Sequence, residues 1–165
     1  MMSEVDFEIG SWVVYPSHGV GRLEEIETVV IDGDQMQFYK LTFQNNNLTL
    51  KIPVSKAVSA GMRKLSRKED MEEVYELLRH KGRKKGAMWS KRAQEYASKI
   101  NSGSPVEIAQ VIRELYKEGG ANSLSFSEKQ VYLLAMERLA REISIVDEID
   151  ENEAVRRLEV ILQAA

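Results

Sequence analysis

The hydrophobic period changes near residue 60, and this change constrains the fold more than any other feature. Before it, apolar residues alternate as in strands, and after it they recur at helical spacing. One regular element cannot carry both periods, so the chain must contain two kinds of structure. Its 165 residues suit one sizeable domain or two small ones, and the change of period favours two. We predict an α+β protein with a β domain over residues 1–60 and an all-α helical bundle over residues 61–165.

The first part contains four or five short extended segments separated by turns. Asp32-Gly33 lies between two of them, and Asp-Gly is the strongest short signal for a hairpin. Over residues 48–53, Leu and Ile alternate with Thr49 and Lys51, and Pro53 ends the run. So many strands in about 50 residues predict a small, strongly bent β-barrel rather than a sandwich of the immunoglobulin type.

The second part contains several helix-start signals. Ser66 and Ser104 are each followed three residues later by Glu, which predicts capping boxes, and the Ser104 box has a proline at the first helical position. Ser125–Glu128 is expected to start a long helix. A further helix is expected from about Trp89 to Ile100, and a last one after Asp150. The apolar stripe expected for the helix after Ser125 comprises Val131, Leu134, Ala135, Leu139 and Ile143.

Charge is strongly segregated along the chain, although the net charge is only −3. Residues 61–100 carry a net charge of +6, whereas the segments before and after them are acidic. No acidic residue occurs between Leu77 and Gln94. A basic band within an acidic chain indicates contact with a polyanion over a limited area, and the alternative is a solvated linker.

The chain lacks the residue patterns of the common enzyme and metal sites. It has no Cys, and its two His, His18 and His80, fall in different predicted domains. We therefore expect no zinc or iron site and no cofactor. No phosphate-binding or nucleophile motif occurs. The acidic residues Glu24, Glu25 and Glu27 are more typical of a solvated strand face than of a catalytic pair, and His18 is more typical of a turn. An enzyme is not expected.

Trp89 lies within the basic band and is followed at once by Lys91 and Arg92. An indole beside cations can stack on a base or wedge against a base step while the cations hold phosphates. Alternatively, Trp89 packs into the helical core. The sequence position alone does not separate the two interpretations.

Three motifs in order carry a resemblance to a known family. They are the opening Gly10–Gly21 (GSWVVYPSHGVG), the strand Leu48–Pro53 (LTLKIP) and the helix start Trp89–Arg92 (WSKR). With this spacing, the chain resembles the CarD-like (CdnL) family of bacterial transcription regulators over nearly its whole length. The resemblance implies a Tudor-like (SH3-like) barrel that binds the β subunit of RNA polymerase. The same module occurs in the transcription-repair coupling factor.

The resemblance also implies a helical domain that contacts promoter DNA at the upstream edge of the transcription bubble. There Trp89 would wedge into the minor groove and slow bubble collapse, and Lys91 and Arg92 would contact the DNA backbone. We add Lys84 and Lys85 from charge alone.

On the first domain, Lys51 falls where the family has a basic residue at the polymerase interface, and we assign Thr49 and Pro53 to the same surface. Another basic contact of some members aligns with Val29, which departs from the pattern.

The expected function is therefore a non-enzymatic transcription regulator that stabilises the open promoter complex. The alternative is a protein–protein adaptor whose barrel binds a partner and whose helical half has no role on DNA. We expect no membrane partner, a cytoplasmic location and a monomer in isolation.

Overall fold

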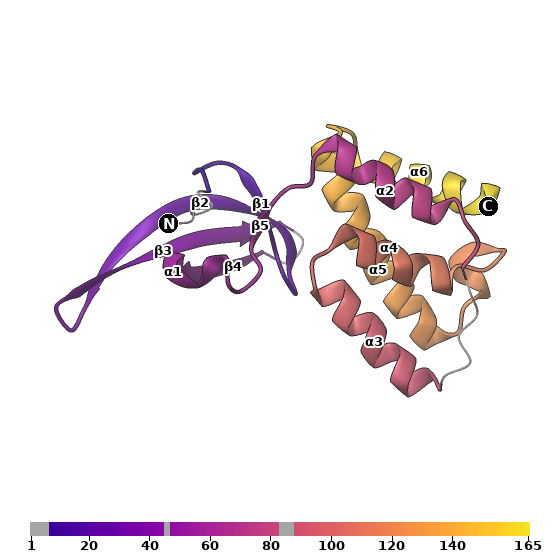
Figure 1. Cartoon of the computed structure of the whole chain (residues 1–165), viewed down its shortest axis with the longest axis horizontal. Coiled ribbons are helices and arrows are strands. Elements are labelled where there is room, and N and C mark those ends of the chain that lie inside the picture. Colours follow the sequence, from indigo (N-terminus) through magenta and orange to yellow (C-terminus); the bar gives the residue numbers. More distant parts are fainter. Residues whose placement is uncertain (1–6, 45–46, 83–87) are drawn as a thin grey trace. The chain divides into compact units, whose positions relative to one another are not determined.

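The computed structural model describes residues 7–44, 47–82 and 88–165. The chain divides into two compact units, Met1–Leu65 and Ser66–Ala165 (Figure 1). The division comes later than residue 60 because Met62 is buried in the core of the first unit and the strand that follows Met62 pairs with the first strand. The α+β architecture with two domains is confirmed.

The first unit is a five-stranded antiparallel sheet in the order β4-β3-β2-β1-β5. In the part that the structure describes, the ladder ends at β4 on one side and at β5 on the other. The strands are β1 Trp12–Tyr15, β2 Gly19–Ile31, β3 Asp34–Phe43, β4 Leu48–Pro53 and β5 Arg63–Lys64, and the short helix α1 Val54–Ala57 follows β4.

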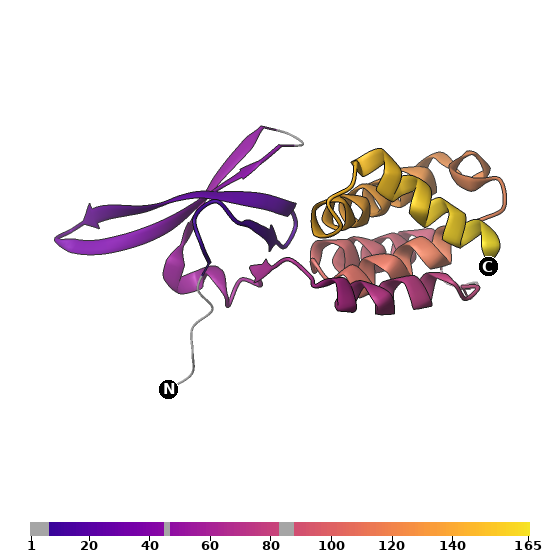
Figure 2. The same cartoon turned by 90° about the horizontal axis from the view of Figure 1, so that it is seen from above.

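The Asp-Gly hairpin between β2 and β3 is confirmed. Asp32 and Gly33 have φ of 51° and 84°, as a two-residue type I′ turn requires, and Ile31 pairs directly with Asp34. A register shift between Leu23 and Glu25 bends β2. Together the turn and the bulge produce a strongly twisted sheet whose β2–β3 hairpin extends beyond the other strands (Figure 2).

One face of the sheet forms the core of the first unit. The alternation predicted for β4 is confirmed, because Ile52 is buried, Leu48 and Leu50 pack against the core, and Thr49 and Lys51 are exposed. Buried residues from several segments complete it: Phe7, Val13, Leu23, Tyr39, Leu41, Phe43, Ala57 and Met62.

The turn before β2 holds His18 among aromatic side chains. Its ring lies 6.0 Å from the ring of Tyr15 and 5.4 Å from that of Phe43, and Gly19 takes a positive φ of 82°. This agrees with the interpretation of His18 as a turn residue.

The second unit contains five α-helices and one short 3-10 helix in its described residues. α4 packs against α2, α3 and α5, and α6 packs on α5 and α2. The elements are α2 Lys68–Leu78, α3 Trp89–Asn101, α4 Pro105–Leu115, η1 Gly120–Ser123, α5 Phe126–Val146 and α6 Glu151–Ala164.

Three of the predicted helix starts are confirmed. The hydroxyls of Ser104 and Ser125 accept hydrogen bonds from the third helical backbone N–H, and Asp150 caps α6. The box predicted at Ser104 is only half formed, because the N–H of Ser104 donates to Oγ of Ser102 rather than to Glu107. The prediction for Ser66 is wrong. Arg67 is the N-cap of α2, and its backbone N–H donates to Asp70. The N–H of Ser66 instead donates to Glu142 of α5, so a tertiary contact replaces the local cap.

The buried stripe of α5 differs from the expected one. Ala135, Leu139 and Ile143 are buried as predicted, but Leu134 is 39% exposed and Val131 is only half-buried. The helix is rotated toward its neighbours through Tyr132 and Met136, which are both buried. Two consecutive leucines at 133 and 134 made the face ambiguous in the sequence.

Candidate functional site

Thr49, Lys51 and Pro53 lie on one face of the edge strand β4, opposite to the core. The register places them beside Thr42, Lys40 and Phe38 of β3. Because paired residues in an antiparallel ladder share a face, this row forms a continuous surface across β3 and β4. We call it the outer face. The structure thus brings the three residues predicted for the first domain together.

Lys51 forms an ion pair across the outer face. Its Nζ lies 2.9 Å from Oε2 of Glu27 on β2, and 57% of its side chain is exposed. The hydrogen bond from Lys51 is the main cause that lowers the pKa of Glu27. The positive charge of Lys51 is therefore partly compensated by Glu27, yet the ammonium remains accessible to a partner.

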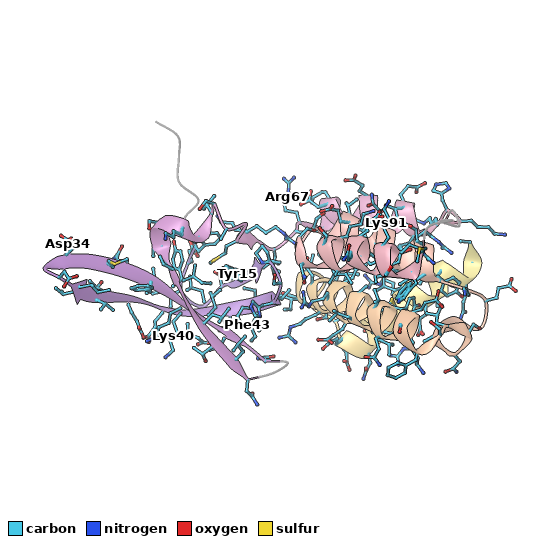
Figure 3. The ribbon with its side chains drawn as sticks, turned by 90° about the horizontal axis from the view of Figure 1, so that it is seen from below. Tyr15, Asp34, Lys40, Phe43, Arg67 and Lys91 are labelled. Carbon is cyan, nitrogen blue, oxygen red and sulfur yellow. The ribbon has the colours of Figure 1, made fainter. Side chains whose placement is uncertain are left out.

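Beyond β4 the outer face continues along a two-stranded arm. Residues 28–37 of the β2–β3 hairpin pair only with each other, and Asp34 lies at the tip of the arm while Lys40 lies toward its base (Figure 3). Val29 pairs with Met36, and both are exposed, at 39% and 37%.

Ile31 shares this face of the arm and is 44% exposed. The sequence analysis missed Ile31 and Met36 as surface residues, although the alternation around the Asp-Gly turn placed them on one face. Val29, the position noted above as a departure from the pattern, is thus part of an apolar patch.

The acidic residues of β2 form no convergent site. Glu24 accepts a hydrogen bond of 2.8 Å from Oγ1 of Thr42, and Glu27 is paired with Lys51. Within residues 7–44, 47–82 and 88–165, no three His, Cys, Asp or Glu side chains are grouped to hold a metal ion. These observations favour the interpretation as a solvated strand face.

In the second unit, the start of α3 holds an aromatic and basic cluster. Trp89 is half-buried and packs against the helical core, with its ring 6.1 Å from that of Tyr96. The guanidinium carbon of Arg92 lies 5.6 Å from the Trp89 ring and 5.5 Å from the Tyr96 ring. The arginine therefore covers the two rings from one side.

Tyr96 links this cluster to α4. Its hydroxyl accepts hydrogen bonds from Nη2 and Nε of Arg92, at 3.0 and 3.3 Å, and donates to Oε1 of Glu114 at 3.4 Å. Lys99 lies 4.0 Å from the same carboxylate. Arg92 and Tyr96 thus contact Trp89, and Glu114 and Lys99 extend the network behind them. The sequence analysis did not foresee this network.

The predicted cations of this site differ in their surroundings. Lys91 is exposed, whereas the guanidinium of Arg92 is engaged by Tyr96 and the two rings. Lys84 and Lys85 lie outside the described residues. Of the two described cations, Lys91 is thus accessible, whereas Arg92 is packed against Trp89 and Tyr96.

Two large apolar side chains near helix starts are strongly exposed. Met88, which precedes Trp89, is 77% exposed, and Phe126, the first residue of α5, is 78% exposed. Glu128 lies one turn into α5, and a backbone hydrogen bond from Ser125 is the main cause that lowers the pKa of its carboxyl. The charge of Lys117, whose Nζ lies 3.7 Å from Oε1 of Glu128, lowers it further, and that of Arg92 does so least. Nothing in the sequence distinguished Met88 and Phe126 from core residues.

None of the helices in the described ranges is long and apolar enough to cross a membrane.

Comparison with known proteins matches both units to family models. Residues 7–66 match the model described as the CarD-like/TRCF RID domain, where TRCF is the transcription-repair coupling factor, and residues 73–159 match the CarD C-terminal domain. The protein named "Putative transcription factor YdeB" from Bacillus subtilis (strain 168) is 29% identical over 147 residues. That similarity covers 89% of this chain and 96% of the relative.

A solved structure is also similar in sequence. The solution NMR structure of the 72-residue N-terminal domain of Myxococcus xanthus CarD is 25% identical to this chain and covers 38% of it and 84% of that domain. The TM-score is 0.31, which is too low to support a fold assignment.

Proposed function

Because the chain belongs to the CarD family of transcription regulators, we propose that it joins RNA polymerase to promoter DNA and stabilises the open complex. The outer face of the first unit would bind the polymerase β subunit. The start of α3 would contact DNA at the upstream edge of the bubble. No step in this function requires catalysis.

The arrangement of Trp89 supports the DNA role most directly. An indole that is braced on one side by Arg92 and Tyr96 and remains partly exposed is pre-positioned, so it loses little side-chain entropy on stacking. The adjacent exposed Lys91 supplies a cation for a phosphate. Arg92 acts in this proposal as a positioning residue for Trp89.

The outer face supports the polymerase role. It combines an accessible ammonium at Lys51 with a strand at the edge of the sheet, so a partner can use side-chain contacts or add a strand to β4. The neighbouring apolar patch at Val29 and Met36 extends the area that a partner can cover.

Two binding surfaces on one chain reduce the affinity that each one needs. Once the first unit is bound to polymerase, contact of the second unit with DNA is effectively intramolecular. Stacking of one aromatic contributes about 1–3 kcal/mol, which corresponds to about 5- to 150-fold in bubble stability. That range suits a modulator of transcription rather than a motor that melts DNA.

The first experiment measures the lifetime of promoter open complexes on purified bacterial RNA polymerase. Wild-type protein should lengthen the lifetime. With Trp89→Ala, which should still bind polymerase, the lifetime should be at least about fivefold shorter than with wild-type protein. Trp89→Phe, which keeps a ring, should retain an intermediate effect. An unchanged lifetime with wild-type protein that is bound to polymerase would overturn the DNA role.

The second experiment tests the polymerase surface by binding to the isolated β subunit. Lys51→Glu should weaken binding, because it removes the ammonium and places two carboxylates together at Glu27. Lys51→Gln removes only the charge and should weaken binding less. Lys64→Glu, an exposed lysine on the opposite edge strand β5, is the matched control and should bind as wild type. Normal binding by Lys51→Glu would refute the assignment of this surface.

One observation favours the adaptor as a second candidate. Trp89 packs against the helical core and is covered by Arg92, as expected of a structural residue. Fluorescence in a Trp12→Phe background separates the two, because a wedge needs an indole that quenchers reach and that promoter DNA protects. Emission from Trp89 that is blue, protected and unchanged by DNA would favour the adaptor.

A further inference from the structure

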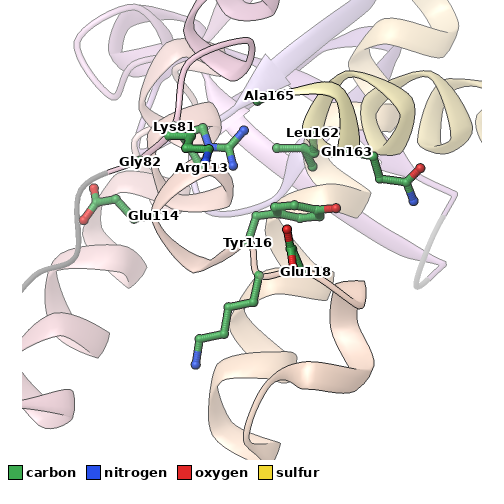
Figure 4. A pocket seen from close by; sticks show the side chains of 10 residues that line it. Lys81, Gly82, Arg113, Glu114, Tyr116, Glu118, Leu162, Gln163 and Ala165 are labelled. Carbon is green, nitrogen blue, oxygen red and sulfur yellow. The ribbon is translucent and has the colours of Figure 1, made fainter.

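A pocket of about 690 Å³ lies in the second unit, apart from the start of α3 (Figure 4). It is bounded by the segment after α2, the end of α4 and the end of α6, and its volume is typical of a small-molecule site. Its walls are mixed, with the Tyr116 ring and Leu162 beside the charged groups of Lys81, Arg113, Lys117 and Glu118.

Arg113 is the most unusual group in this pocket. The residue is only 9% exposed, and Nη1 donates a 2.8 Å hydrogen bond to the carbonyl oxygen of Leu78. Its Nε is buried and has no hydrogen-bond partner. Burial lowers the pKa of Arg113, and the neighbours that oppose this effect are Tyr116 and Tyr132 rather than a carboxylate. Among the described residues, Arg113 therefore forms no ion pair.

A buried guanidinium without a counter-ion is costly, because the desolvation of the charge is not compensated. The Leu78 carbonyl satisfies one donor of five and gives Arg113 a structural role at the end of α2. It leaves the Nε donor unmatched, and the positive charge has the Tyr116 ring beside it but no carboxylate among the described residues.

None of the acidic groups in the described residues forms an ion pair with Arg113, although Glu114, Glu118 and Ala165 also line the pocket. The carboxylate of Glu114 contacts Tyr96 and Lys99. The guanidinium carbon of Arg113 lies over the Tyr116 ring, 5.3 Å from its centroid, and the side chain of Glu118 also lines the pocket (Figure 4). Lys81, by contrast, is exposed at the mouth of the pocket.

Gly82 shapes the wall beside Arg113. A Cβ added at Gly82 would lie 2.5 Å from the backbone oxygen of Arg113, so only glycine lets the segment after α2 pass this close to α4. The close approach brings Lys81 to the mouth of the pocket. The wall is therefore a built feature of the sequence.

We propose that this pocket binds a phosphate group, with Arg113 as the buried counter-charge and Lys81 as the cation at the entrance. The phosphate belongs either to a free nucleotide, whose base would lie against Tyr116 and Leu162, or to the DNA backbone. Arginine and lysine in this arrangement match phosphate chemistry. The proposal does not depend on the function proposed above.

The test is an NMR titration of the full ¹⁵N-labelled chain with inorganic pyrophosphate at constant ionic strength. We expect saturable shifts of the Gly82 and Leu162 amides and a downfield shift of the Arg113 Nε–H, which gains an acceptor. Lys81→Gln should weaken binding about fivefold. Arg113→Lys should weaken binding tenfold or more, because lysine lacks Nε and the planar guanidinium group. Lys68→Gln, an exposed lysine at the start of α2, is the matched control.

Two results would overturn the proposal. One is the absence of saturable shifts in the wild-type chain. The other is an equal effect of Lys81→Gln and Lys68→Gln, which would indicate general ionic attraction. Because Lys81 is exposed, its variant keeps the test valid even if Arg113→Lys disturbs the fold.

Displacement of pyrophosphate by two competitors, AMP and a short DNA duplex, identifies the source of the phosphate. If AMP displaces pyrophosphate and also shifts the Tyr116 amide, the ligand is a nucleotide. If only the duplex displaces it, the ligand is the DNA backbone. Either result supports the phosphate site, and displacement by neither would overturn it.

Discussion

Removal of the Tyr96 hydroxyl should destabilise the second unit by about 1–2 kcal/mol. Tyr96 is fully buried, and Tyr96→Phe keeps the ring, so no cavity forms. The variant loses only the oxygen that accepts from Arg92 and donates to Glu114. Hydrogen bonds to charged groups contribute about 1.5–3 kcal/mol, and the half-buried position of Arg92 lets water replace part of that.

The assay is urea unfolding of the full chain in a Trp12→Phe background, so that Trp89 alone reports on the second unit. The same loss should lower its melting temperature by about 4–8 °C for each kcal/mol. Arg92→Met supplies the second arm of a double-mutant cycle, with an expected coupling of about 1 kcal/mol.

A Tyr96→Phe variant as stable as wild type would refute this account of the network. So would an equal loss with and without Arg92, because the hydroxyl would then act through other groups. In the open-complex assay, Tyr96→Phe should shorten the lifetime if Arg92 positions Trp89. It should leave the lifetime unchanged or longer if Arg92 contacts phosphate.

Three further outcomes are expected. A backbone hydrogen bond from Ser125 is the main cause that lowers the pKa of Glu128 from 4.5. The ionised Glu128 carboxylate therefore stabilises the fold at pH values above its unfolded pKa. This stabilisation is lost as the pH falls through the folded pKa. Glu128→Gln should therefore be less stable than wild type at neutral pH in thermal melts, and the gap should close at acid pH. Gly21→Ala should destabilise the sheet by about 1–3 kcal/mol in urea unfolding, because its Cβ would lie 2.6 Å from the Phe43 ring. Gly33→Ala meets no neighbour but has φ of 84°, so the same assay should show a smaller loss of about 1 kcal/mol.

Local signals predicted most of the elements correctly. The Asp32-Gly33 turn and the caps at Ser104 and Ser125 depend on backbone geometry and hydrogen bonds within a few residues, which the sequence displays directly. The cap expected at Ser66 failed because a distant carboxylate, Glu142, took its N–H. The sequence analysis had no means to detect that tertiary contact.

The sequence predicted which residues belong to the candidate sites but not which side chains they contact. Alternation in β4 placed Thr49 and Lys51 on the open face, yet the Glu27 partner comes from two strands away and depends on the β2 bulge. Similarly, the order of Trp89 and Arg92 in the chain showed that they were neighbours. Their bracing by Tyr96 required the fold, because charge patterns alone do not show which cation is already engaged.

The β2–β3 arm has a consequence for the thermodynamics of association. A two-stranded ribbon without a third strand is only marginally stable in water, so amides in residues 28–37 should exchange with solvent faster than those that pair with β4. A protein that covers Val29 and Met36 would therefore also complete the ordering of the arm. Its binding should show a larger decrease in heat capacity, and a larger entropic penalty, than rigid docking of the same surface.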